Sequence, residues 1–534
     1  MAEKSPVELR EAIGRIMPLM TAADFCDCNA REKGEQEALV DRRRRLTWWQ
    51  VKNLSDRLAL GLRRLGLQRD ARVLVQLPNQ AELFLTRLAC EKAGVRLVTV
   101  APTFRRAEVE PIIQLTEPEA AIVRPEYRSF DLVELLKDTP SASLQHVLAV
   151  GDDVPPGTVS LAELLSATPD ERDLQQLQRS RYTILDVCQI ATTSGSTGIP
   201  KCVEVPLYTR LLTGWIHLRR FGVTSTETLA AATPIITGTA DALVYNGGCA
   251  IGGRIVLLDH FTPEVACSVL ETEQVNVMPL VPTMMVRMMN LPNLPSYDLK
   301  SLRLVVNHGA ALPFAQGKQF EALFNCRIAQ ALGSVDCGGI CATRWNDPPE
   351  VRLGTVGAPL DGNEIKIVDA NGKELPQGEG GRLLVRGLHT DARFLKNPVL
   401  NRERRRDGYF DLQELARFDA HGNVILMGRE QELIIRGGQN IYPADVEAAL
   451  TQHPNVLEVC VVGIPDPEMG ERVWAFAVCR DGKELSLSDM KSFLAEKGLA
   501  KFKWPEGLRI VASLPKVAAG HKVDRRKLQE MATA

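Results

Sequence analysis

The sequence has no run of about 18 consecutive apolar residues, so no membrane-spanning helix is expected. It also has no excess of charge, because 64 Lys and Arg stand against 66 Asp and Glu for a net charge of -2. Proteins that hold nucleic acid need a surplus of basic residues, so this balance gives no reason to expect such a partner. The stretch from Met1 to Arg10 has no apolar core of the secretory type, and a cytoplasmic protein is expected.

The spacing of the 12 cysteines does not indicate a disulfide framework. The pairs Cys26/Cys28 and Cys337/Cys341 do not have the spacing of structural zinc ligands, and no paired Cys/His cluster stands near them. Most are expected to be buried thiols in a reducing compartment. The overall composition, 45% hydrophobic and 24% charged residues, is that of a globular protein. The length of 534 residues predicts two or more domains.

Strand and helix patterns alternate along much of the chain. Residues 72–77 read as a strand, Asn79 as the cap of the helix that follows, and residues 95–100 as a second strand. The same alternation returns over 254–306. This pattern predicts an α/β fold, with a large N-terminal domain, residues 1–429, of parallel-rich sheets flanked by helices. Ligands of such sheets bind beyond the carboxyl ends of the strands.

The pattern changes near residue 430. Two alternating segments, 456–462 and 472–478, predict strands joined by a turn, and a helix is expected from Ser488, whose hydroxyl would cap it. We therefore predict a small, mobile α+β domain over residues 430–534.

Residues 193–201 form a hydroxyl- and glycine-rich segment after an apolar strand. Glycine lets backbone N–H groups turn toward an anion, hydroxyls add donors, and a lysine adds positive charge. These residues alone leave two interpretations open, a nucleotide phosphate loop or an ordinary Ser/Thr/Gly turn. The candidate phosphate-binding residues are Thr193, Ser194, Gly195, Ser196, Thr197, Gly198 and Lys201.

Further segments follow in a fixed order, and together they resemble the acyl-adenylate-forming superfamily of acyl- and aryl-CoA ligases, peptide-synthetase adenylation domains and luciferases. The matching segments are 77–84, 193–201, 354–359 (Gly-Thr-Val-Gly-Ala-Pro), 407–410 (Asp-Gly-Tyr-Phe), 428–429 (Gly-Arg), 437–438 (Gly-Gly) and 522–526 (Lys-Val-Asp-Arg-Arg). The resemblance implies ATP-dependent activation of a carboxylic acid as an acyl-AMP with release of pyrophosphate, then transfer to a thiol. It implies ATP, Mg²⁺ and coenzyme A as cofactors.

The resemblance also implies roles for residues of the nucleotide site. Leu332 stands where an aromatic residue packs near adenine in relatives, and Asp336 stands at the acidic metal ligand. Glu414 takes the ribose role in strict register, with Asp411 as its rival, and Arg429 would support ribose and phosphate. The remaining implied nucleotide-binding positions are Gly309, Gly333 and Ser334.

The C-terminal motif is displaced by one residue, because His521 separates Gly520 from Lys522. Lys522 is the predicted catalytic lysine, acting with Lys201, and would offset the repulsion between carboxylate and α-phosphate. The neutral imidazole of His521 would be a poorer substitute. The resemblance places the hinge at Gln431 and the thiol tunnel at Gly437 and Gly438, although both glycines also fit a plain turn.

The acid pocket is assigned to Thr237, Gly238, Ala310 and Ala311. Relatives that activate ortho-hydroxylated benzoates use an Asn where this chain has Gly238, which cannot make that contact. Small residues predict an apolar, open pocket for an aromatic, alicyclic or medium-chain acid. The first expectation is a free-standing CoA ligase. Loading of a separate acyl-carrier protein, a non-catalytic nucleotide- or acyl-binding homologue, and a homodimer remain open.

Overall fold

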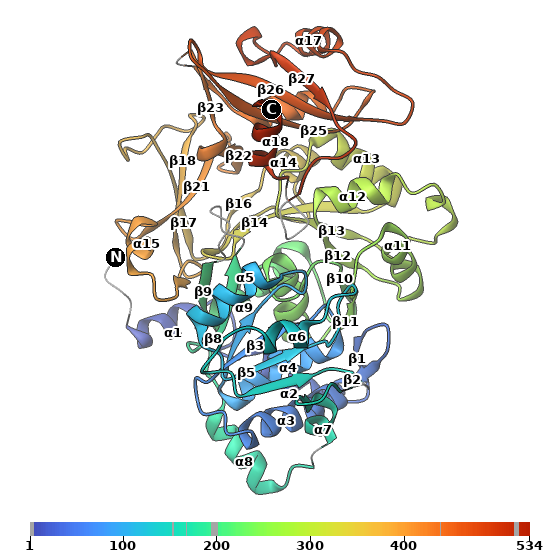
Figure 1. Ribbon diagram of the computed structural model, residues 1–534, viewed down its shortest axis with the longest axis vertical. Coiled ribbons are helices and arrows are strands. Elements are labelled where there is room, and N and C mark those ends of the chain that lie inside the picture. The colour runs from blue at the N-terminus through green and yellow to red at the C-terminus, as the bar shows by residue number, and fades with distance from the viewer. Residues whose placement is uncertain are drawn as a thin grey trace.

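The computed structural model describes residues 5–151, 154–166, 168–193, 201–437, 439–516 and 523–533. Two large sheets of mainly parallel strands make up the lower and middle parts of the view in Figure 1. A five-stranded sheet follows on the left, and the C-terminal domain, coloured orange to red, lies at the upper end of the long axis. This arrangement confirms the predicted α/β class, with a large domain of parallel-rich sheets and a smaller domain after it.

The first large sheet has eight strands, and its centre is parallel because helical crossovers connect its strands. Its apolar central strands are buried on both faces, as parallel sheets require. In spatial order the strands are β19 (Arg393–Phe394), β9 (Lys201–Pro206), β8 (Val187–Thr193), β4 (Arg96–Thr99), β3 (Arg72–Gln76), β5 (Ala120–Val123), β6 (His146–Ala149) and β7 (Val159–Ser160).

The second large sheet has nine strands, parallel from β1 through β14 and antiparallel at both edges. Its carboxyl ends carry the loops 232–239 and 308–313, which flank the predicted acid pocket. In spatial order the strands are β16 (Ala358–Pro359), β15 (Gly338–Ala342), β14 (Arg327–Ser334), β13 (Leu304–Asn307), β12 (Val277–Leu280), β10 (Thr228–Ala231), β11 (Arg254–Leu257), β1 (Glu37–Val40) and β2 (Arg45–Thr47).

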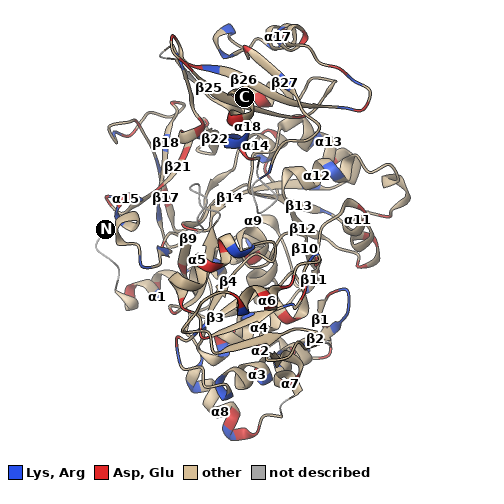
Figure 2. Cartoon of the chain, in the orientation of Figure 1, with Lys and Arg blue, Asp and Glu red and all other residues tan. Residues whose placement is uncertain are grey.

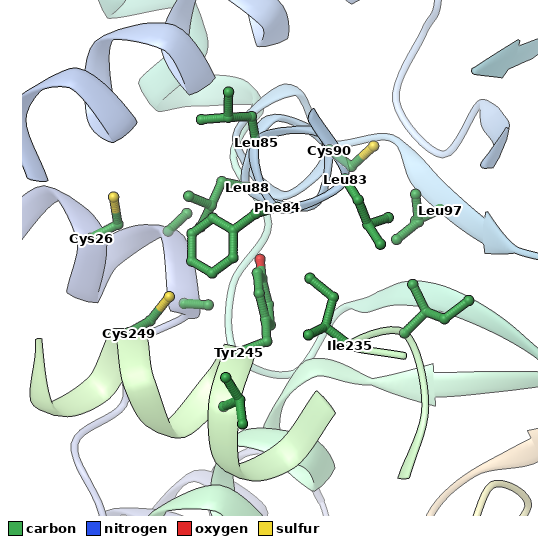
Figure 3. Packing of buried hydrophobic residues seen from close by; sticks show 14 of the residues in the cluster. Cys26, Leu83, Phe84, Leu85, Leu88, Cys90, Leu97, Ile235, Tyr245 and Cys249 are labelled. Carbon is green, nitrogen blue, oxygen red and sulfur yellow. The ribbon is translucent and has the colours of Figure 1, made fainter. Parts of the chain in front are cut away.

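Helix α4 (Ala81–Ala93) is the central helix of the large domain, since every one of its residues is buried. Figure 3 shows Phe84 and Leu88 of α4 facing Tyr245 of the π-helix η1 (Ala240–Gly247), and the rings of Phe84 and Tyr245 meet edge to face with centroids 5.0 Å apart. The other helices of this domain are α1 (Pro6–Gly14), α2 (Ala22–Lys33), α3 (Trp48–Arg64), α5 (Arg106–Thr116), α6 (Leu132–Lys137), α7 (Leu161–Ser166), α8 (Glu171–Ser180), α9 (Leu207–Phe221), α10 (Gly248–Ile251), α11 (Pro263–Thr272), α12 (Pro282–Met289), η2 (Leu294–Ser296), α13 (Phe314–Phe324), α14 (Pro349–Gly354) and α15 (Pro398–Glu403).

Two antiparallel sheets complete the chain. The first contains β17 (Asn363–Val368), β18 (Gly381–Gly387), β20 (Arg405–Arg406), β21 (Tyr409–Phe418) and β22 (Val424–Arg429). The C-terminal domain contains η3 (Glu430–Glu432), β23 (Ile434–Arg436), β24 (Gln439–Ile441), α16 (Pro443–Leu450), β25 (Val456–Asp466), β26 (Gly470–Cys479), α17 (Leu487–Glu496), η4 (Lys501–Lys503), β27 (Gly507–Ile510) and α18 (Arg525–Thr533). Basic and acidic residues interleave over both domains in the view of Figure 2.

Three local predictions were wrong. The N-cap of α4 is Gln80, and Asn79 instead crosses to the second large sheet. The cap of α17 is Ser486, whose Oγ accepts from Asp489 N at 3.1 Å, so Ser488 lies inside the helix. Strand β25 runs on to Asp466, past residue 462 where the predicted strand ends, because its ladder with β26 continues. No helix in the described ranges is long and apolar enough to cross a bilayer.

The cysteines are free thiols and nearly all are buried, as predicted. Burial in apolar surroundings raises the pKa of Cys26 and of Cys202 to about 12. A thiol with such a pKa stays protonated at neutral pH, so these residues act as small apolar side chains.

Glu91 in α4 makes stability depend on pH. Its carboxylate accepts from Ala23 N at 2.9 Å and from the Tyr245 hydroxyl at 3.2 Å, and burial raises its pKa to about 7. The unfolded carboxyl titrates near its ordinary value of 4.5, so between these two pH values the native state binds more protons. Stability is therefore expected to fall as pH rises through this interval.

We predict that Glu91→Gln, which keeps the hydrogen-bonding shape without the titration, flattens the decline of the melting temperature between about pH 5 and about pH 8. Differential scanning fluorimetry of both proteins over this range measures the effect. The exposed carboxylate variant Glu374→Gln is the control. Parallel curves for the wild type and Glu91→Gln would contradict the prediction.

Candidate active site

The predicted phosphate loop leaves from a pair of antiparallel strands. Thr193 ends β8, Lys201 begins β9, and the two residues are direct partners in the ladder. The Lys201 Nζ lies 5.8 Å from the centre of the Phe394 ring. Both ends of the loop are thus fixed in the first large sheet. The predicted residues Ser194, Gly195, Ser196, Thr197 and Gly198 lie outside the described ranges.

The end of β14 holds the predicted adenine and metal residues. Leu332 and Gly333 lie at a bulge in the pairing with β15, and Leu332 packs against the apolar cluster beneath it. The Asp336 carboxylate accepts from the Ser334 hydroxyl at 2.7 Å, and Arg404 Nη2 lies 3.4 Å from its other oxygen. Asp336 is therefore held from two sides at the carboxyl end of a strand.

The donors at this strand end can be compared with what Mg²⁺ requires. Within the described ranges, no group of three or more His, Cys, Asp or Glu side chains is placed to hold a metal ion. Mg²⁺ commonly keeps several waters and uses one or two carboxylates together with substrate phosphates. Asp336 fits such a site as a single carboxylate ligand, and it would have to exchange its contact with Arg404 for the ion.

The rival carboxylates for the ribose lie in different surroundings. Glu414 of β21 is the ladder partner of Arg429 in β22, and the Arg429 Nε donates to Glu414 Oε1 at 3.0 Å. Asp411 is buried, accepts from Gln413 N at 2.8 Å, and forms an ion pair with Arg382 at 3.6 Å. The carboxylate that Arg429 contacts is thus Glu414.

One wall of the predicted acid pocket is the loop after β10. Asn79 holds it by donating to Thr233 O at 2.9 Å and accepting from Ile235 N at 2.9 Å. Arg87 of α4 also donates to Ile235 O. The Gln189 amide donates to Ile236 O at 2.7 Å. Four hydrogen bonds from buried side chains therefore fix the loop that carries Thr237, which is half-buried, and Gly238, which is exposed.

The opposite wall follows β13. Buried Asn307 donates to Gln330 Oε1 at 2.6 Å and to Ala310 O at 3.1 Å, which fixes the turn. Gly309 has φ +80°, a left-handed conformation that favours glycine, and Ala310 and Ala311 are exposed. His308 lies between β13 and this turn, with its ring beside Gly238.

A buried ionic network links the helices α4, η1 and α9. Asp241 of η1 is fully buried and accepts from Arg87 Nη2 at 2.8 Å, and the Arg210 Nε lies 3.8 Å away. Arg210 in turn donates to Val335 O at 3.1 Å, next to Asp336. A cavity of about 20 Å³ beside Arg87 and Arg210 has room for one water. The network therefore connects the acid loop with the strand end that carries Asp336.

Two of the residues predicted for the hinge and the thiol tunnel lie in the described part of the C-terminal domain. Gln431 lies in η3, directly after the end of β22. Gly437 has φ +56°, a left-handed conformation that favours glycine, and a Cβ there would meet the flexible end of the Met469 side chain at 2.8 Å. Gly438 and Lys522 lie outside the described ranges. The segment that carries Lys522 starts and ends at the bridge between Lys516 and Val523.

Sequence reasoning missed Asn79 as a pocket support, the Arg87–Asp241–Arg210 network, His308 and Arg404. A charged residue within the apolar segment 240–245 was a usable signal, because isolated carboxylates are rarely buried unpaired. The side chains of His308 and Arg404 gave no such signal, since their partners are distant in sequence.

Two parallel-rich sheets followed by a small α+β domain are the architecture of the adenylate-forming ligases. The chain belongs to the AMP-binding enzyme family: the AMP-binding enzyme profile matches residues 26–391, and the AMP-binding enzyme C-terminal domain profile matches residues 445–521.

Similar proteins include ligases for aromatic acids. The chain is 32% identical over 516 residues to the 2-hydroxy-7-methoxy-5-methyl-1-naphthoate–CoA ligase of Streptomyces carzinostaticus, covering 94% of this chain and 91% of that protein. It is 28% identical to the 2,3-dihydroxybenzoate-AMP ligase of Bacillus subtilis (strain 168), covering 96% and 93%. The fold matches the anthranilate CoA ligase AuaEII in complex with anthranoyl-AMP with a TM-score of 0.89 at 24% identity, covering 97% and 98%.

The ionic network predicts a strong effect for one isosteric change. Asp241→Asn removes the negative charge that lies between Arg87 and Arg210, and breaking such a buried pair costs about 3–5 kcal/mol. Chemical denaturation is expected to show this loss. The exposed pair Lys366–Glu374, 3.1 Å apart, offers the control Glu374→Gln, which is expected to cost less than about 1 kcal/mol. Equal small losses for both variants would show that the network is not stabilising.

Proposed function

We propose that this enzyme activates an aromatic carboxylic acid with ATP and transfers the acyl group to coenzyme A. The observation that carries the proposal is the pairing of Glu414 with Arg429 at the domain border, which keeps a carboxylate for the ribose beside a guanidinium. The similarity to ligases of aromatic acids over most of the chain supports an aromatic acid as the substrate. The names of these similar proteins include both CoA ligases and AMP ligases, so coenzyme A as the acceptor of the acyl group is part of the proposal.

The first half-reaction brings two anions together. A carboxylate oxygen attacks the α-phosphorus, the bond to the bridging oxygen of the β-phosphate breaks, and pyrophosphate leaves. The protein must therefore orient the groups and offset their charge. In our proposal Glu414 accepts from the ribose hydroxyls, Arg429 holds that carboxylate, and Lys201 and Lys522 contact the phosphates. Asp336 would hold the Mg²⁺, which would neutralise charge on the leaving pyrophosphate.

The second half-reaction needs access for a thiol. The thiolate attacks the acyl carbon, the bond to the AMP oxygen breaks, and AMP leaves. The turn at Gly437 exposes a residue without a side chain, and only η3, Leu433 and β23 lie between Arg429 and this turn. We propose that a rotation at Gln431 brings Gly437 and Gly438 to the adenylate after pyrophosphate has left. The domain boundary at 429/430 falls at the end of β22 and remains a prediction.

The test is ATP–pyrophosphate exchange with a panel of benzoates, naphthoates, cyclohexane carboxylates and linear C6–C12 acids, followed by product mass with CoA present. We expect exchange with aromatic acids and an aryl-CoA product. Exchange without an aryl-CoA product would indicate that a carrier protein, and not CoA, accepts the acyl group. Folded protein that binds ATP but exchanges with no acid would favour the non-catalytic homologue.

Lys522→Ala is expected to lower exchange by about 10²-fold or more, because removal of one preorganised charge donor at a reacting centre has that effect. Retained ATP binding would separate chemistry from binding. Lys527→Ala, an exposed lysine in α18, is the matched control and should leave exchange unchanged. Normal exchange by Lys522→Ala would contradict the assigned role.

Arg429→Ala is expected to raise the KM for ATP by about 10-fold or more with a smaller change in kcat, since a hydrogen bond to a charged group contributes about 1.5–3 kcal/mol. Steady-state kinetics at varied ATP measures both constants. The variant Asp411→Asn is the comparison, because it alters the rival carboxylate. A larger rise in the KM for ATP for Asp411→Asn than for Arg429→Ala would indicate that Asp411, and not Glu414, binds the ribose.

A further inference from the structure

We propose that Arg404 competes with Mg²⁺ for the Asp336 carboxylate, so that this enzyme binds ATP with little dependence on a divalent ion. The inference deepens the proposed function and rests on it, because it takes the triphosphate and its ion to lie beside Asp336. It adds a positioning residue, a guanidinium that neutralises this carboxylate before an ion arrives.

Arg404 is a fixed cation at the end of α15. Its backbone N–H donates to Leu400 O at 3.0 Å, and its carbonyl accepts from Asp411 N at 2.8 Å. The guanidinium carbon lies 4.9 Å from the centre of the buried Phe410 ring, which is a cation–π contact. The side chain is only 12% exposed. Contacts other than the one with Asp336 therefore hold this positive charge in place.

The two ends of the guanidinium contact two parts of the proposed nucleotide site. Nη2 lies 3.4 Å from Asp336 Oδ2, while Nη1 donates to the side-chain oxygen of Gln413. Gln413 has φ +60°, a left-handed conformation that is uncommon for a residue with a side chain, and it directly precedes Glu414. Arg404 can thus release Asp336 while Nη1 still holds the backbone before Glu414.

The contact between Arg404 and Asp336 is one that an ion can replace. Its length of 3.4 Å exceeds the usual length of a charge-assisted hydrogen bond, about 2.7–2.9 Å, so the contact is weak. The other carboxylate oxygen accepts from the Ser334 hydroxyl at 2.7 Å, which orients Asp336 without adding charge. The Asp336 side chain is 20% exposed and open to an ion from solvent. Because two cations beside one carboxylate repel each other, the ion and Arg404 compete for it.

The same contact changes how ATP binds. An unpaired Asp336 would repel the triphosphate, because like charges at short distance disfavour each other in a partly buried site. Arg404 offsets this repulsion with a positive charge that belongs to the chain. When the ion is present, Asp336 exchanges one cation for another, so the net gain for ATP binding is small. A neutral residue at position 404 would make ATP binding depend on the ion.

The experiment measures the Kd of ATP by isothermal titration calorimetry in EDTA and in excess Mg²⁺, with no carboxylic acid present, so that no adenylate forms. For the wild type, removal of Mg²⁺ is expected to raise the Kd by less than about 5-fold. Arg404→Gln should raise the Kd in EDTA by about 10-fold or more, as expected for the loss of a contact between charged groups. Its Kd in Mg²⁺ should stay within about 3-fold of the wild-type value.

Three further variants separate electrostatics from a structural role. Arg404→Lys keeps the charge and should keep most of the binding in EDTA. The double variant Asp336→Asn/Arg404→Gln removes both charges and should restore binding in EDTA, which a merely structural role of Arg404 would not produce. Arg402→Gln, which changes an exposed arginine of α15, is the matched control and should bind ATP as the wild type does. Melting temperatures show that each variant is folded.

Three results would overturn the inference. The first is a wild type that loses ATP binding in EDTA. The second is an Arg404→Gln variant that binds ATP equally weakly in EDTA and in Mg²⁺, or that changes neither Kd. The third is a folded double variant that does not recover binding in EDTA.

Failure of the inference and failure of the proposed function give different results. If ATP binding in EDTA depends on Arg404 but no aromatic acid supports exchange, the inference holds and the proposed function is wrong. If aromatic acids support exchange and yield aryl-CoA, but Arg404→Gln leaves both Kd values unchanged, the inference is wrong and the proposed function holds. Folded wild type that binds no ATP in either condition would overturn both.

Discussion

The active-site face depends on one buried interaction, the ion pair between Arg87 and Asp241 with Arg210 beside it. Two guanidinium groups and one carboxylate in the interior are tolerable only when each charge has partners. Their hydrogen bonds hold Ile235 in the loop after β10 and Val335 next to Asp336. The strength of a charged network in a low dielectric makes the distance between these two loops hard to change.

Above this network, three sheets meet over a shared apolar cluster. Ala191 and Val203 of the first sheet, Ile340 of the second and Ala416 of the third are all buried in it. Because each sheet ends at this cluster, the phosphate loop, the Asp336 turn and the Glu414–Arg429 pair project from one common base. Residues far apart in sequence can then act on one nucleotide, which is the arrangement that adenylation requires.

Local patterns were enough to predict the α/β class, the strand–helix–strand unit over 72–104 and the small second domain, because apolar periodicity and turn residues are local signals. Local patterns could not predict roles that depend on contacts between residues far apart in the sequence. Asn79 looked like a helix cap because it follows Pro78, whereas its partners are 152 and more residues away. The contact of His308 with Gly238 likewise depends on where β13 ends, which local patterns do not show.

The most direct test of this account is a crystal structure of the protein with salicyl-sulfamoyl adenosine, a non-hydrolysable adenylate mimic. The account predicts ribose hydroxyls within hydrogen-bonding distance of the Glu414 carboxylate and the aromatic ring of the ligand beside the loops 232–239 and 308–313. A ribose bound to Asp411, or an aromatic ring that lies away from both loops, would contradict it.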